Sequence, residues 1–157
     1  MNVDVIKPLL NLPWDMLYFV TGEGSWKFRP HEQVVLEAVI DHLDSSSQSI
    51  LRSLLKQRMF VQRSHSRIVR PRFYTSNYAR LHKPTDSLGN KVYEVVIDVD
   101  GQRQRAHVEF FHGEVDSIQF FRPGDFYAGK TVRAEKVSET DPSLTNAAEV
   151  DRGEHGD

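Results

Sequence analysis

Cysteine is absent from this chain, and its absence excludes several kinds of site at once. Without a thiol, the 157 residues form no disulfide, no thiolate zinc site and no cysteine nucleophile. Long apolar runs are also missing: Leu9 to Val20 comes closest to the roughly 20 residues of a membrane span, but Asn11, Pro13 and Asp15 interrupt it. The N-terminus has no basic region followed by an apolar signal core. We therefore expect a cytoplasmic protein with no membrane partner.

The usual signatures of catalysis and cofactor binding are missing as well. The chain has neither a GxGxxG nor a GxxxxGK[ST] phosphate-binding loop, and it has no GxSxG nucleophile elbow. The seven histidines are scattered, and His107 and His112, five apart on a predicted strand, point to opposite faces. Ser64-His65-Ser66 are neighbours in sequence, a geometry that seldom joins a nucleophile to its base. We predict no catalytic residue, no metal site, no cofactor and no enzyme; a small hydrolase remains the least favoured alternative.

Length and composition indicate one ordinary domain followed by a polar tail. With 39% hydrophobic residues, the chain can bury a single core, and its net charge of −2 neither requires nor excludes a charged partner. Hydrophobic residues become rare beyond about Ala134, while acidic residues accumulate. We expect a single α+β domain over residues 1–133 and an acidic, disordered tail over residues 134–157.

The clearest local prediction is a β-hairpin within Lys91 to Phe121. Asp100-Gly101 separates two alternating runs, and this dipeptide suits a two-residue type I′ turn because both residues tolerate positive φ. The turn sets the register, which makes one face apolar. The pairs expected on that face are Val99 with Gln102, Ile97 with Gln104, Val95 with Ala106, and Tyr93 with Val108. The opposite face should pair Asp98 with Arg103 and Glu94 with His107.

Two helices are predicted before the hairpin and further strands around it. Apolar residues recur at helical spacing over Pro30 to Asp44 and again over Gln48 to Met59, with a serine turn between the two segments. Val69 to Tyr74 resembles a strand, which Pro71 should restrict to an edge. His112-Gly113 should lead into a third hairpin strand with a bulge near Asp116-Ser117. The predicted fold is α+β, with two N-terminal helices on one face of an antiparallel β-meander of about four strands.

A basic stretch is the strongest anomaly of composition. No Asp or Glu occurs from Ser45 to Thr85, where four aromatic residues are interspersed among nine Lys and Arg residues. Basic and aromatic side chains together are what nucleic-acid binding uses, so a nucleic-acid-binding module over residues 52–83 is our alternative function. Two other interpretations stay open: these cations balance acidic residues elsewhere in the fold, or they bind an acidic protein.

The order of features resembles small bacterial immunity proteins of polymorphic-toxin and contact-dependent growth inhibition systems. The resemblance covers roughly residues 28 to 127 and consists of patterns of apolar and charged positions. The segments that carry it are Pro30 to Leu36, Leu51 to Gln57, Val61 to Ile68 and His107 to Phe121. It implies an antitoxin that binds a cognate toxin domain and blocks its active site.

That resemblance also suggests where a partner would bind. Toxin domains of this kind are often basic nucleases, and an acidic surface would associate with them quickly and specifically. The acidic candidates for partner contacts are Glu94, Asp98, Glu109, Glu114 and Asp116. Trp26 and Tyr93 are the candidate aromatic anchors.

Overall fold

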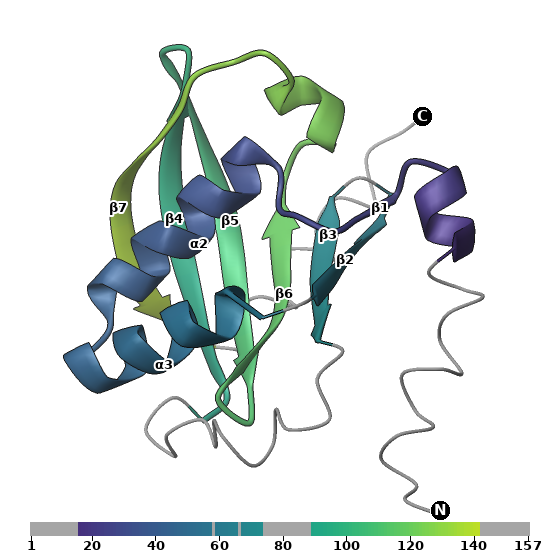
Figure 1. The fold of residues 1–157 in the computed structure, drawn as a ribbon. Coiled ribbons are helices and arrows are strands. Elements are labelled where there is room, and N and C mark those ends of the chain that lie inside the picture. The colour runs from purple at the N-terminus through teal and green to yellow at the C-terminus, as the bar shows by residue number, and fades with distance from the viewer. Residues whose placement is uncertain (1–15, 58, 66, 74–88, 142–157) are drawn as a thin grey trace, which may run out of the picture.

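Seven antiparallel strands in one sheet form the framework of this chain, as a computed structural model shows for residues 16–57, 59–65, 67–73 and 89–141 (Figure 1). The strands are β1 (Gly24–Ser25), β2 (Met59–Ser64), β3 (Ile68–Phe73), β4 (Lys91–Val99), β5 (Gln102–Phe111), β6 (Glu114–Phe120) and β7 (Val132–Thr140). Their order across the sheet is β1-β2-β3-β6-β5-β4-β7. The prediction of a β-meander of about four strands is therefore wrong, because the sheet has seven strands and places β3 beside β6 and β4 beside β7. The α+β class is confirmed.

Two helices cover one face of this sheet. Both α2 (Pro30–His42) and α3 (Ser45–Leu55) lie on the same side of β4 and β5 in Figure 1. Their apolar stripes point into the core, where Leu36, Val39 and Leu51 are almost completely buried. A helix at 16–20 lies beside β1, and the short 3-10 helix η1 (Gly124–Tyr127) lies near the start of α2 (Figure 1).

The second helix begins earlier than predicted because an aspartate caps it. The Asp44 side chain accepts hydrogen bonds from the backbone N–H groups of Ser46 and Ser47, both at 3.0 Å. These bonds satisfy donors that have no partner within the helix, so the serines form the first turn of α3 instead of a loop. The hydrogen bond from the Ser47 hydroxyl, followed by these backbone bonds, lowers the pKa of Asp44.

The predicted hairpin is confirmed in position and in register. β4 and β5 pair Val99 with Gln102, and the pairing continues to Lys91 with Phe110 without a shift. Asp100 and Gly101 have φ angles of 50° and 84°, as a type I′ turn requires. The predicted bulge is also present: Glu109 pairs with Ser117 and Phe110 pairs with Val115, which leaves Asp116 as the extra residue.

Residues 134–140, expected to begin the disordered tail, instead form most of β7. This strand pairs with β4 from Val99–Val132 to Val92–Thr140. Val132 and Val137 are half-buried against the core, and the free edge of β4 supplies backbone partners. Residues 142–157 of the predicted tail lie outside the described residues.

Pro71 does not confine β3 to the rim of the sheet. β3 lies between β2 and β6, but its pairing with β6 covers only Ile68 and Val69. Beyond Val69, the side of β3 that faces β6 has no ladder partner among the described residues. Pro71 has no backbone N–H to donate, and it lies in a stretch of β3 that needs no donor on that side, as in an edge strand.

Candidate partner-binding face

The face of the sheet opposite α2 and α3 is the candidate functional surface, and we call it the open face. Strand alternation sends Tyr93, Val95 and Ile97 into the core and their neighbours to the other side. No described helix covers these neighbours in Figure 1. The open face carries Val92, Glu94, Val96 and Asp98 from β4, Arg103, Arg105, His107, Glu109 and Phe111 from β5, Glu114, Ser117 and Gln119 from β6, and Arg133, Lys136 and Ser138 from β7. Among these, Val92, His107 and Ser117 are buried, so the accessible part of the face lies mainly over β4, β5 and β7.

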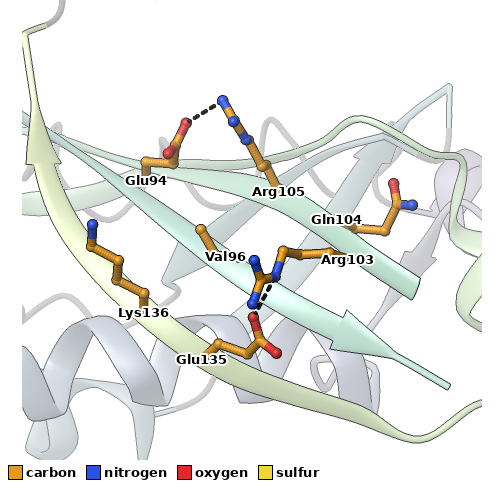
Figure 2. A pocket seen from close by; sticks show the side chains of 7 residues that line it. All are labelled: Glu94, Val96, Arg103, Gln104, Arg105, Glu135 and Lys136. Carbon is orange, nitrogen blue, oxygen red and sulfur yellow. Dashed lines mark hydrogen bonds and ion pairs between the residues drawn. The ribbon is translucent and has the colours of Figure 1, made fainter. Parts of the chain in front are cut away.

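A shallow hollow of about 690 Å³ occupies the part of this face that is formed by β4, β5 and β7. Figure 2 shows its side chains standing on the three strands, with the helices behind the sheet. The lining residues are Glu94, Val96, Arg103, Gln104, Arg105, Glu135 and Lys136. Charged groups thus surround a single aliphatic side chain, that of Val96.

Two ion pairs connect strands in the hollow, one between the neighbours β4 and β5 and one between β5 and β7 across β4. Arg105 reaches Glu94 with an N–O distance of 3.4 Å, and the Nε of Arg103 donates to Glu135 at 2.8 Å (Figure 2). Glu135 reaches Arg103 across β4 from a bulge in β7, because Val96 pairs with Lys136 while Ile97 pairs with Ala134. Both arginine side chains are mostly exposed, at 65% and 76%, so each pair stabilises the fold by less than about 1 kcal/mol.

Two carboxylates of the open face are also bound within the fold. Glu109 accepts hydrogen bonds from the Ser117 hydroxyl at 2.8 Å and from the Gln119 amide at 2.7 Å. Glu94 lies 3.5 Å from the Nε2 of His107 in addition to its contact with Arg105. The open face therefore carries both acidic and basic side chains, whereas the sequence suggested an acidic surface.

The predicted contact residues are spread over several parts of the molecule. Glu94, Asp98, Glu109 and Glu114 share the open face, and Asp116 is exposed at the bulge of β6. Trp26 is 45% exposed and packs edge-to-face on Phe60 near β1, at the far end of the sheet. Tyr93 is only 4% exposed and packs in the core against Phe110 and His42, so it cannot anchor a partner.

The cations of the hollow were not among the predicted contacts. Arg103 and Arg105 alternate with Gln104, a pattern that is visible in the sequence. On β4, Arg103 lies opposite Asp98 and Arg105 lies opposite Val96. Lys136 had no such signal, because it falls in the segment expected to be a tail, and Arg133 is the last residue of the predicted domain. Two large aromatic residues, Phe111 and Phe121, are also exposed beside this surface, at 55% and 36%.

Part of the basic stretch is used inside the fold. The guanidinium of Arg63 is buried on Glu32, and Arg52 contacts Glu37 and Asp41 of α2. Arg67, Arg70 and Arg72 are exposed on the β2–β3 hairpin. Arg58, Arg80 and Lys83 lie outside the described residues. Arg52 and Arg63 therefore balance acidic residues within the fold, which was one of the open interpretations of the basic stretch.

A second cavity, of about 530 Å³, lies where η1 meets the start of α2. His31 stacks on Tyr127 there, with ring centroids 4.6 Å apart, and burial lowers the pKa of His31. Burial also raises the pKa of Tyr127. The Tyr127 hydroxyl has no hydrogen-bond partner of ordinary geometry among the described residues. The nearby backbone N–H of Arg122 offsets part of the rise in pKa. Arg29, Asp125 and Lys130 complete the polar part of the lining.

Within the described residues, no three or more His, Asp or Glu side chains converge as metal ligands would. No helix in the same part of the chain has the length and apolarity needed to cross a bilayer. Comparison with known proteins finds no matching family model, no matching curated protein and no matching solved structure.

Proposed function

We propose that this protein is an immunity protein that neutralises one cognate toxin domain by placing its open face over the toxin. The proposal combines the resemblance in sequence with one structural observation. That observation is a broad sheet face, free of described helices, that mixes exposed aromatic rings with partly satisfied charged groups. A stoichiometric inhibitor needs such a surface and needs no reacting group.

The composition of the open face suits recognition of a protein. Protein interfaces are enriched in aromatic residues and arginine, and a few such side chains contribute most of the binding free energy. Phe111 and Phe121 supply exposed rings, and Arg103 and Arg105 supply guanidinium groups that retain free donors. A standard interface takes about 800 Å² from each partner, which a face of several strands can provide.

The sheet should bind without much rearrangement. β4 pairs along nearly its whole length with both β5 and β7, and α2 and α3 pack against the other face. A surface held in this way loses little conformational entropy when a partner binds, and this favours tight association. Inhibition would then follow from exclusion: substrate cannot reach a toxin site that a rigid sheet covers.

Co-expression with the toxin domain encoded beside this chain tests the proposal. The full-length protein should rescue growth and should form a stable complex with the purified toxin domain. Phe111→Ser should abolish rescue, whereas Phe19→Ser should leave it unchanged. Phe19 is a matched control because it is 52% exposed, close to the 55% of Phe111, and lies on the helix at 16–20 away from the open face. Absence of rescue by the unmodified protein would refute the proposal.

Nucleic-acid binding remains the alternative function, supported by the exposed Arg67, Arg70 and Arg72. Binding through these residues would neutralise phosphates and release counterions, so the affinity should fall steeply with salt. Titration with RNA and DNA at two salt concentrations separates the alternatives. Salt-sensitive binding that Arg70→Ser weakens would favour this function over inhibition of a toxin.

A further inference from the structure

We infer that the hollow on the open face binds a carboxylate of the partner protein, which makes the docking surface of the partner acidic. This inference deepens the proposed function and rests on it. It concerns the row of side chains that crosses β7, β4 and β5 at Val96. In that row, Val96 pairs with Lys136 on one side and with Arg105 on the other.

The neighbouring row has a carboxylate of the chain itself at its centre. There, Asp98 pairs in register with Arg103 on β5 and with Arg133 on β7, while its carboxylate accepts from the Gly101 N–H at 3.3 Å and Arg103 donates to Glu135. Adjacent strands are about 4.8 Å apart, so both cations of each row lie on strands next to the central residue. The Val96 row also has one cation on each side, Arg105 and Lys136, but its central side chain is aliphatic. A carboxylate of a partner placed over Val96 would lie between these two cations.

The donors required for such a group are present in the hollow. Lys136 has no described hydrogen-bond or ion-pair partner, and Arg105 contacts Glu94 through one terminal nitrogen only. Arg103 donates to Glu135 through Nε, which leaves both of its terminal nitrogens without a described partner. Charge-assisted hydrogen bonds to a carboxylate are the strongest contacts these groups can make.

The two acidic residues of the hollow favour a protein over a nucleic acid. Glu94 and Glu135 flank the Val96 row, on either side of the position where the carboxylate would bind (Figure 2). A single carboxylate over Val96 would meet three cations (Arg103, Arg105 and Lys136) against these two acidic groups, a balance that still favours one anion. A continuous phosphate backbone would have to pass at least one of them, and the repulsion between like charges would weaken its binding.

Titration of the full-length, isotopically labelled protein with defined probes tests the inference by NMR. The probes are a short capped peptide that alternates glycine with glutamate, the same peptide with glutamine, and a DNA duplex. The glutamate peptide should shift the resonances of Val96, Arg105 and Lys136, and the glutamine peptide should not. Lys136→Glu should weaken binding of the glutamate peptide about tenfold or more, because a contact between opposite charges becomes one between like charges.

Lys56→Glu is the matched control, because Lys56 is exposed at the end of α3, on the helix side of the sheet. It changes the net charge equally and should leave the affinity for the peptide within about twofold. Equal effects of the two variants, or no shifts at the hollow, would overturn the inference. The inference would also be overturned if DNA bound more tightly than the glutamate peptide and Lys136→Glu abolished the binding of DNA. Failure of the toxin rescue would instead refute the proposed function, since the titration needs no toxin.

Discussion

The guanidinium of Arg63 and the carboxylate of Glu32 form a buried, two-point ion pair. Nε and Nη2 of Arg63 each donate to a separate oxygen of Glu32 at 2.7 Å, and the side chains are only 2% and 1% exposed. The backbone N–H of Arg29 also donates to Glu32, and Arg63 donates to the Ser25 hydroxyl at 2.8 Å. The pair therefore connects β2, the start of α2 and the segment containing β1.

Removal of either partner of this pair should destabilise the fold strongly. Arg63→Met leaves the Glu32 charge buried, and Glu32→Gln leaves the Arg63 charge buried, so each should lower the free energy of unfolding by about 3–5 kcal/mol. The double variant Glu32→Gln/Arg63→Met should cost less than the two single variants together, because no charge is left without its partner. Urea unfolding of the unmodified protein, the two single variants and the double variant measures these changes in the free energy of unfolding. Additive effects would show that the two side chains act independently.

Acidification should weaken the fold through His31. Burial lowers the pKa of His31 below its ordinary value of 6.5, so the unfolded chain takes up the proton first as the pH falls. The free energy of unfolding should therefore decrease once the pH drops below about 6.5, and this contribution should level off below the folded pKa. His31→Phe keeps a ring against Tyr127 and removes the titration, so it should flatten this part of the profile. Urea midpoints across that pH range provide the measurement, and an unchanged slope in the variant would assign the effect to another group.

Gly24 should not tolerate a side chain. A Cβ at this position would collide with the tip of the Phe60 ring and lie 3.0 Å from the backbone carbonyl carbon of Tyr18. Gly24→Ala should lower the free energy of unfolding by about 1–3 kcal/mol, because the ring and the β1 segment must shift. The same substitution in a Phe60→Leu background should cost less, since the smaller side chain leaves room. Equal costs in both backgrounds would place the strain in the backbone instead.

The hairpin turn should depend on Gly101 more than on Asp100. Gly101 has a φ of 84° and open space around it, so Gly101→Ala meets no clash but forces an L-residue into a strained backbone conformation. We expect a loss of about 1 kcal/mol in the free energy of unfolding. Asp100→Asn should be nearly neutral, because asparagine tolerates positive φ and keeps the oxygen that accepts from the Thr131 N–H at 3.0 Å. Thermal unfolding of the two variants side by side is the measurement.

The sequence predicted the parts of the fold that depend on neighbouring residues. The Asp100-Gly101 turn, the register of β4 on β5 and the bulge at Asp116 all follow from local turn chemistry and from the alternation of side chains. Strand β7 was missed because its charged side chains resemble those of a solvated tail. Only its position beside the free edge of β4 makes it a strand.

The candidate site divides in the same way. Alternation placed Glu94, Asp98 and Glu109 on one face, and the predicted pairing of Glu94 with His107 is confirmed. The other partners of Glu94 and Glu109 were not predicted. Glu94 meets Arg105, Glu109 meets Ser117 and Gln119, and the cations opposite Val96 and Asp98 come partly from β7. A surface that looked acidic along one hairpin is therefore mixed across the sheet.

By itself, the amino-acid sequence determined the local periods, the turns and the choice of which side of each strand is apolar, because steric and hydrophobic preferences act between residues that are close along the chain. Only the tertiary structure decided that β7 lies against β4, that Arg63 reaches Glu32, and that Lys136 lies beside Val96. Those relationships join residues tens of positions apart. They depend on how all the elements pack around one core, which no local pattern specifies.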